Sequence, residues 1–335
     1  MTTVERISLF QFRDRLIAGC DARLDEEERK AALALWPAAN VKRRLVRWGL
    51  KLRPARSLWR MVDALPHLSI PQLNQLLQWA GLLDTGTPWL LFWPGRRDRQ
   101  RMYVRYRKND DCGLIKVALD KSNRLDLEHE ASVLEHVRDK SMTFRAPSVL
   151  GSHGWGDNMW ALHLSGWPVD RGNRPDAPRP VSGHEVVGAA DQVGAFLLQL
   201  SEQKRSMPVG STDWFNDFVE NAPSGAWAME LKQASEQKIP VAWAHGDLGP
   251  GNMVRRDDGQ LFVYDWEGAS AQAPLHTDAI ACWLAVRQRA ALRNPRSVRA
   301  KLLSSWPNLT QDELGWILAF LVARENVAAA EILKC

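Results

Sequence analysis

The stretch His245-Gly246-Asp247-Leu248-Gly249-Pro250-Gly251-Asn252, followed by Val263-Tyr264-Asp265-Trp266-Glu267, decides how this 335-residue chain folds. It places Asn252 five residues after Asp247, and Asp265 thirteen residues after Asn252. The apolar run 240–244 predicts a buried strand, which the glycines and the proline of the first motif end in a tight loop. Two short strands around a turn at 257–259 are predicted next, and this hairpin brings Asn252 and Asp265 together.

Carboxylate and amide oxygens at this spacing suit phosphoryl transfer from Mg-ATP. In such a site one carboxylate orients the acceptor hydroxyl and takes its proton, while an amide oxygen and a second carboxylate hold Mg²⁺ against the phosphates. A zinc site would instead call for His or Cys ligands. Each of these residues is also a common turn former, but their combination with the following apolar strand favours the catalytic interpretation.

His245-Gly246-Asp247 with Asn252, and then Asp265-Trp266-Glu267, resemble the aminoglycoside phosphotransferase and choline kinase family. The resemblance implies that Asp247 is the catalytic base and that Asn252 and Asp265 bind Mg²⁺. It also implies an α+β, protein-kinase-like two-lobed fold, with a small β-rich N-lobe and a larger, mostly helical C-lobe. The loop departs from the family at Gly249, where many members have His.

Asp278 resembles a structural Asp that follows the second motif in this family. An acid at the N-cap or in the first turn of a helix is the other interpretation of the same residue. The sequence leaves both open.

The small-lobe part of the pattern is predicted upstream. The run 112–119 reads as a strand that carries Lys116, and 125–137 reads as a helix with Glu130 on its apolar stripe. A carboxylate on a buried stripe is costly without a cationic partner, so we expect Glu130 to pair with Lys116. The resemblance implies that Lys116 then binds the phosphates of ATP. A solvated edge-strand Lys and a surface Glu are the alternatives.

Two further parts of the nucleotide site are less clear in the sequence. The run 159–164 reads as the last small-lobe strand, and the resemblance implies that the backbone from His163 and Leu164 to Gly166 reads adenine. No G-x-G-x-x-G motif occurs near the expected place. The turn 93–97 lies there instead, between strands predicted at 88–92 and 102–106. Which amides or arginines cover the phosphates stays open.

The chain divides by pattern into three segments. Residues 1–85 form a helical, partly basic N-terminal extension, 86–166 the N-lobe, and 167–335 the C-lobe with the catalytic loop 245–252 and the metal motif 265–267. In the extension, helices are predicted at 9–17, 26–35, 41–50 and 71–82. In the C-lobe, helices are predicted at 185–201, 275–289, 298–306 and 311–330.

Residues 42–60 of the extension carry eight bases and no acid, interleaved with apolar residues. Such a stretch suits an anionic membrane surface, an acidic partner or a polyanionic substrate, and equally a solvated helix face. No recognition motif for nucleic acid accompanies it, so nucleic acid is not an expected partner. By contrast, 210–281 carries eleven acids and four bases, which suits a hydroxylated cation as acceptor.

Composition indicates a globular protein with a formal net charge of +5. The four cysteines are far apart and form no C-x-x-C pair, which favours a reducing compartment without structural zinc. The N-terminus lacks the pattern of a signal peptide, and no uncharged apolar run is long enough to cross a bilayer. A cytoplasmic location is therefore expected, with a peripheral position at the inner membrane surface as the alternative.

The sequence thus predicts a kinase that transfers the γ-phosphate of ATP to a hydroxyl of a small molecule, such as a sugar, an aminoglycoside or an amino alcohol. GTP could replace ATP. One alternative is a kinase for a lipid-linked or polymeric saccharide or a protein, docked by the basic extension. A binding scaffold that keeps the fold without catalysis is the other.

Overall fold

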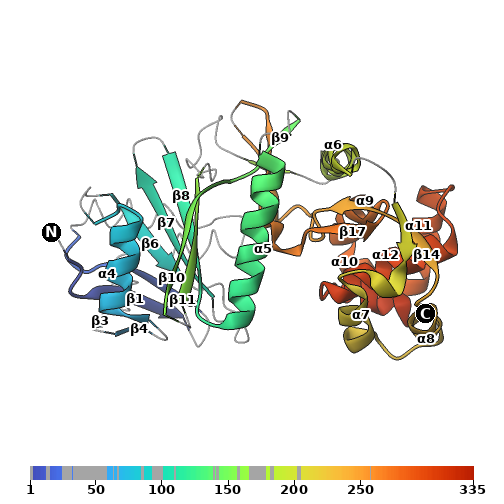
Figure 1. Cartoon of the computed structure of the whole chain (residues 1–335), viewed down its shortest axis with the longest axis horizontal. Helices are drawn as coiled ribbons and strands as arrows, with labels where there is room; N and C mark the ends of the chain where they lie inside the picture. Colours follow the sequence, from blue (N-terminus) through green and yellow to red (C-terminus); the bar gives the residue numbers. More distant parts are fainter. Residues whose placement is uncertain are drawn as a thin grey trace. The chain divides into compact units, whose positions relative to one another are not determined.

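The structure of the chain is a computed structural model (Figure 1). It describes residues 3–12, 16–24, 32, 59–62, 64–65, 68–83, 87–92, 101–108, 111–138, 140, 143–156, 159–165, 179–181, 185–201, 205–256 and 258–335. The helices predicted at 26–35 (Ala32 excepted) and 41–50, the bases of 42–58, Gly166, and the arginines of the turn 93–97 with Arg99 lie outside these residues.

The chain forms two compact units. The first comprises Met1–Arg138 with Ala146–Arg179, and the second Asp139–Arg145 with Pro180–Cys335. The first unit is rich in strands and the second is mostly helical (Figure 1). The predicted α+β class, with a β-rich N-terminal part and a helical C-terminal part, is confirmed. No helix in the described residues is long and apolar enough to cross a membrane.

An eight-stranded sheet, in the order β10-β11-β8-β7-β6-β2-β1-β3, forms the first unit. Its neighbouring strands pair antiparallel. The strands predicted at 88–92, 102–106, 112–119 and 159–164 all belong to it. The strands are β1 Ile7–Phe12, β2 Leu16–Asp21, β3 Trp59–Val62, β6 Trp89–Phe92, β7 Arg101–Lys108, β8 Asp111–Ala118, β10 Ser148–Trp155 and β11 Met159–Ser165.

Two helices cover opposite faces of this sheet (Figure 1). They are α4 (Ile70–Trp79) and α5 (Lys121–Arg138). Successive strand residues point to opposite faces. In β8, Ile115 and Val117 pack in one apolar core with the buried leucines of α4. Lys116, between them, therefore faces the other way, toward α5.

The N-terminal extension contributes strands to the sheet. The helix predicted at 9–17 is wrong, because the described residues of this range, 9–12 and 16–17, lie in β1 and β2, which pair antiparallel from Ile7↔Asp21 to Phe12↔Leu16. β2 in turn pairs with β6, so strands from 1–85 and from 86–166 share one sheet. The helix predicted at 71–82 is confirmed as α4, which begins with a capping box between Ser69 and Gln72.

The second unit surrounds α12 (Gln311–Ala323), whose residues from Leu314 to Ala323 are all buried. A helix that is apolar on every side belongs in a core. A three-stranded sheet in the order β13-β14-β17 packs with it. The remaining elements are β13 Arg205–Pro208, β14 Lys238–Ala244, β17 Ser270–Pro274, α6 Glu185–Leu200, α7 Phe215–Asn221, α8 Ala226–Gln233, α9 Thr277–Ala285, α10 Gln288–Arg293, α11 Pro295–Ser305 and α13 Val327–Leu333.

Two of the predicted C-terminal helices are each broken in two. The helix predicted at 311–330 is interrupted after Ala323, because Glu325 adopts a left-handed conformation with φ 60°. Asn326 then caps α13 by accepting the amide hydrogen of Ala329 at 3.0 Å. The helix predicted at 275–289 ends at Ala285, and α10 begins at Gln288. The sequence pattern continued across both breaks because apolar residues recur at helical spacing on either side.

Candidate active site

The loop 245–252 begins where β14 ends and can form only with glycine at its second position. Gly246 has φ 82°, a conformation that costs residues with a Cβ roughly 1–2 kcal/mol. A Cβ there would also lie 2.0 Å from the carbonyl oxygen of Gly268. The loop therefore lies directly against the 3₁₀ turn Trp266–Gly268, and the two sequence motifs meet in space.

Asp278 holds the start of this loop through two hydrogen bonds. Its carboxylate accepts the amide hydrogen of His245 at 2.8 Å and that of Gly246 at 3.1 Å. Burial raises the pKa of Asp278 to about 6, and the two amide donors act in the opposite direction. Of the alternative interpretation, the N-cap position is wrong, because His276 occupies it, whereas the first-turn position is right, since Asp278 lies in the first turn of α9. Asp278 holds the backbone of the loop in place.

The His245 ring links the two motifs as a neutral imidazole. Its Nε2 lies 3.1 Å from the carbonyl oxygen of Tyr264, and its Nδ1 lies 3.4 Å from the backbone nitrogen of Asp247. The carbonyl needs a donor and the amide needs an acceptor, so the proton sits on Nε2. The ring is fully buried against Trp266, with ring centroids 4.6 Å apart. Sequence reasoning used His245 as a motif residue but gave it no role in the site.

Asp247 and Asn252 are in direct contact. The side-chain nitrogen of Asn252 donates to the Asp247 backbone carbonyl at 2.8 Å and to its Oδ2 at 3.0 Å. Because the nitrogen is committed to Asp247, the amide oxygen of Asn252 is the atom left to act as a ligand. The spacing of five residues in the sequence is thus the spacing of one hydrogen-bonded loop.

The predicted hairpin brings Asp265 to this loop. Its strands, β15 (Met253–Arg255) and β16 (Leu261–Val263), pair antiparallel. At its base the Tyr264 amide donates to the Asn252 carbonyl at 3.1 Å, and the Tyr264 hydroxyl donates to the carbonyl of Gly251. Asp265 follows in a left-handed conformation, φ 71° and ψ 58°. Such a conformation is costly for a residue with a Cβ and is concentrated at functional sites.

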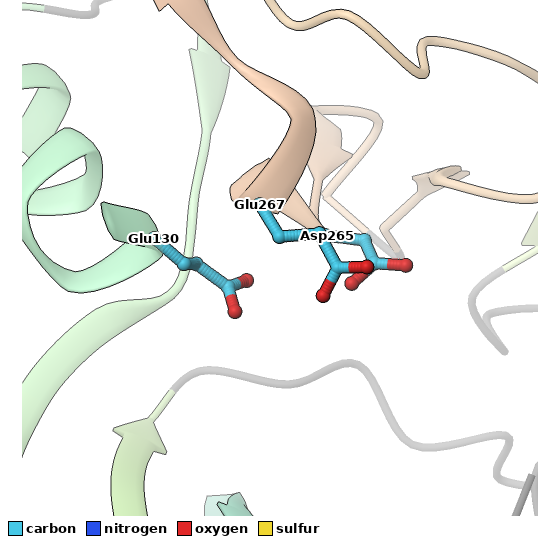
Figure 2. Close-up of side chains that lie close together, drawn as sticks. All are labelled: Glu130, Asp265 and Glu267. Atoms are coloured by element: carbon cyan, nitrogen blue, oxygen red, sulfur yellow. The ribbon is translucent and has the colours of Figure 1, made fainter. Parts of the chain in front are cut away.

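Glu267 was quoted in the motif but not predicted as a site residue. Figure 2 shows its side chain and that of Asp265, both from the segment that follows β16. Their carboxylate oxygens approach within 4.8 Å of each other. These two carboxylates and the amide oxygen of Asn252 are all oxygen donors, which is the kind that Mg²⁺ selects. The signal in the sequence was the second carboxylate, two residues after Asp265.

The ion pair predicted in the first unit is confirmed. Lys116 Nζ donates to Glu130 Oε1 at 2.8 Å, and the two side chains are 1% and 0% exposed. Glu130 projects from α5 (Figure 2). A buried charge survives in the folded state only with such a partner, so the two residues require each other.

His163 and Leu164 point to different faces of β11. Leu164 pairs with Leu114, and Leu162 pairs with Lys116, so these leucines share the face of Lys116. The side chain of His163 faces α4, where its Nε2 lies 2.6 Å from the Tyr106 hydroxyl. Burial lowers the pKa of His163 to about 4, so its ring is neutral and shares one hydrogen bond with the Tyr106 hydroxyl. Any adenine contact of His163 is left to its backbone.

No family model matches the chain, and no curated protein matches its sequence. Among solved structures, the chain is similar to aminoglycoside phosphotransferase APH(4)-Ia in complex with ADP and hygromycin B. The identity is 14%, the match covers 68% of this chain and 81% of that one, and the TM-score is 0.43.

Choline kinase LicA from Streptococcus pneumoniae is also similar, at 12% identity over 71% of this chain and 83% of that one, with a TM-score of 0.40. For spectinomycin phosphotransferase APH(9)-Ia in complex with ADP and spectinomycin, the identity is 10%, the coverage 71% and 90%, and the TM-score 0.33. These proteins are the kind that the two motifs resemble in sequence.

Replacing Gly246 with Ala should cost far more stability than the same change at Gly259. Both glycines have positive φ, 82° and 78°, so both variants carry the left-handed strain. Only at position 246 does the new Cβ meet backbone, since nothing lies within 4 Å of it at position 259. We expect Gly246→Ala to lose about 1–3 kcal/mol more than Gly259→Ala in denaturant unfolding. Equal losses would contradict the close approach of the two motifs.

Asp278 should make its own contribution to the pH dependence of stability. Its pKa in the folded protein, about 6, lies above the usual value of 3.8 for an aspartic acid, so the folded state binds this proton more tightly. The stability of the wild type relative to Asp278→Asn should therefore fall as the pH rises from about 4 to about 6, by on the order of 3 kcal/mol, and then level off. Urea unfolding of both proteins at several pH values measures this difference in stability. A difference that does not vary with pH would show that burial does not control this carboxyl.

Removing one partner of the buried ion pair should destabilise the protein more than removing both. Lys116→Met leaves the Glu130 carboxylate buried without a cation and should cost about 3–5 kcal/mol. The double variant Lys116→Met/Glu130→Leu has neither charge and should recover most of that loss in thermal unfolding. If the double variant is as unstable as Lys116→Met, packing rather than the uncompensated charge causes the loss.

Proposed function

We propose that this protein is a phosphotransferase that moves the γ-phosphate of Mg-ATP to a hydroxyl group of a small molecule. The observation that carries the proposal is the contact between Asp247 and Asn252 beside the hairpin that ends at Asp265. A proton acceptor and an amide lie in contact in this loop, and the carboxylate of Asp265 follows Tyr264, which bonds to Asn252. Phosphoryl transfer is catalysed mainly by such positioning and by charge.

In the proposed reaction Asp247 accepts a hydrogen bond from the acceptor hydroxyl and takes its proton. The acceptor oxygen forms a bond to the γ-phosphorus as the bond from that phosphorus to the β–γ bridging oxygen breaks. ADP leaves with the electron pair of that bond. The hydrogen bond from Asn252 keeps the Asp247 carboxylate oriented toward the acceptor.

Asn252, Asp265 and Glu267 would hold Mg²⁺, and their donor atoms fit it because all are oxygens. Bound Mg²⁺ would neutralise negative charge on the phosphates. The left-handed backbone at Asp265 sets the direction of its carboxylate, and the bonds from Tyr264 to the loop fix Asp265 against Asn252.

Lys116 is proposed to bind the phosphates of ATP, with Glu130 holding its ammonium group. Each is buried, and each needs the other's charge. The expectation that the backbone of His163 and Leu164 reads adenine finds no support, because both residues pair with β10 on one side and with β8 on the other. Leu164 lies on the same face of the sheet as Lys116, so its side chain can cover the nucleotide base from that side.

The small-molecule acceptor in this proposal follows from the resemblance of the two motifs to aminoglycoside phosphotransferases and choline kinases. The structures to which the chain is similar carry names of the same kind, with aminoglycosides, spectinomycin and choline as acceptors. The proposal names a hydroxyl as the reacting group and leaves the rest of the acceptor to the residues around the loop.

Two carboxylate variants should separate catalysis from metal binding. Asp247→Asn removes the proton acceptor and should lower turnover about 10²–10⁴-fold, yet it keeps an oxygen that Asn252 can donate to. Asp265→Asn should instead abolish the Mg²⁺-dependent rise in thermal midpoint with AMP-PNP. That rise corresponds to about 2.7 kcal/mol at 100 times the Kd.

Asp258→Asn is the matched control, since Asp258 lies in the exposed turn of the hairpin. It should behave as the wild type in both measurements. Wild-type turnover in Asp247→Asn would overturn the assignment of the base. The same measurement is made with an analogue of GTP that cannot be hydrolysed. If neither analogue raises the thermal midpoint of the wild type or of the control, the chain does not bind a nucleotide as proposed.

A further inference from the structure

The helices that follow the active-site loop carry a surface of one charge. Between Ala279 and Gln311 the chain has six bases and no acid, whereas the rest of 180–335 has eight bases and eighteen acids. The bases belong to α10, α11 and the turn before α10. We call this set the basic surface, and five of its six members are exposed: Arg287, Arg289, Arg293, Arg296 and Lys301, with Arg299 half-buried.

The exposed cations of the basic surface have no carboxylate partners in the part of the chain that the structure describes. Arg289, Arg293, Arg296 and Lys301 form no ion pair and no side-chain hydrogen bond there. Arg287 is held in place by a different contact. Its guanidinium lies 4.1 Å from the centroid of the Trp283 ring and donates to the Trp283 carbonyl at 3.3 Å. Held against a buried indole, this guanidinium is partly ordered before any ligand arrives.

This surface begins beside the catalytic loop. In α9, the thiol of Cys282 donates to the carbonyl of Leu248 at 3.1 Å. A Cβ on Gly249 would lie 3.5 Å from the Cβ of Ala285, the last residue of α9. Arg287 and Arg289 follow Ala285 by two and four residues. They therefore start next to the part of the loop that lies between Asp247 and Asn252.

The loop itself offers little else to an acceptor on that side. Gly249 and Gly251 have no side chains, and nothing lies within 4 Å of a Cβ placed on Gly251. Leu248 is buried. On this side of Asp247 the loop therefore offers backbone, with Ala285 at the end of α9 beside Gly249.

Most acids near the loop are already engaged, and the exception is Asp191 of α6, an exposed carboxylate whose charge acts on the Cys282 thiol. Asp278 holds two backbone amides. Asp247 contacts Asn252, and Asp265 with Glu267 belongs to the proposed metal site. Thus four of the eleven acids in 210–281 are engaged at the loop, and the cationic acceptor suggested by the acids of this range is the competing prediction.

We propose that the acceptor carries an anionic group, a phosphate or a carboxylate, in addition to its reacting hydroxyl, and that Arg287 and Arg289 bind that group. This inference rests on the proposed function and names its substrate class. Arginine suits this task because its planar guanidinium binds two oxygens of such a group at once. A surface that served solubility alone would mix the two signs of charge.

The test compares acceptors that share a carbon skeleton and differ in charge. Glucose, glucosamine, glucose 6-phosphate and glucuronate form one set; glycerol, ethanolamine, glycerol 3-phosphate and glycerate form another. Phosphoryl transfer from Mg-ATP is measured for each. We expect the anionic members to have the higher kcat/KM, by about tenfold or more, because each Arg–anion contact is charge-assisted. A preference for the neutral or the cationic members overturns the proposal.

Variants of the two arginines show whether the preference arises at the basic surface. Arg287→Gln and Arg289→Gln should raise the KM for anionic acceptors about tenfold or more and leave kcat nearly unchanged, and the neutral acceptors should not respond. Arg205→Gln is the matched control, because Arg205 is exposed on β13 and has no ion pair in the described residues. Equal effects of all three changes would mean that only the overall charge matters, which contradicts a site.

If none of these acceptors is phosphorylated, a binding measurement tests the proposal instead. With Mg-AMP-PNP present in excess, glucose 6-phosphate and glycerol 3-phosphate are titrated while the thermal midpoint is followed. A saturable rise in the wild type and in Arg205→Gln that both Arg287→Gln and Arg289→Gln lack supports the proposal, and no rise overturns it. A nucleotide shift without an anion shift defeats this inference alone. An anion shift without a nucleotide shift defeats the proposed function instead.

Discussion

The hydrogen bonds that the buried carboxylate of Asp278 accepts from the backbone of His245 and Gly246 are the constraint on which the site depends. A glycine-rich loop has many accessible conformations, and fixing each residue costs roughly 1–2 kcal/mol. Because the amides of the first two loop residues bond to a helix in the core, fewer conformations remain accessible to the start of the loop. Asp247 is the next residue, so the backbone that carries its side chain is held in position by the same two hydrogen bonds.

The second anchor comes from the hairpin and uses backbone conformations that most residues avoid. Gly246 and Asp265 both have positive φ, and they lie on the two motifs that meet at Gly268. Glycine adopts this conformation freely, but Asp265 does so at a cost of order 1–3 kcal/mol. The bonds from Tyr264 to Gly251 and Asn252, and the buried ring of His245, hold it there. The loop 245–252 is therefore held in one conformation by several weak constraints that converge on few residues.

The sequence predicts those parts whose cause is local. The hairpin follows from its short apolar strands around a turn, and the pair of Lys116 and Glu130 follows from a carboxylate on an apolar helical stripe. The role of Asp278 could not be derived in this way, since an acid early in a helix has the same pattern whether it caps the helix or bonds to a distant loop. The strands at 9–17 were mistaken for a helix because Leu9, Phe10 and Phe12 fit either element, and the pairing with β6 decides between them.

The charge of the second unit illustrates a more general limit of arguments from composition. An excess of acids in 210–281 suggests an acidic surface. At the loop, however, Asp278 bonds to two backbone amides, Asp247 bonds to Asn252, and Asp265 and Glu267 are the proposed metal ligands. Once bound, a carboxylate no longer attracts a ligand as a free one does, because its field is offset by the groups that it contacts. The exposed arginines after Ala285 have no such partners in the described residues. What a substrate meets is thus set by the charges that remain unpaired, and these can have the opposite sign to the sum.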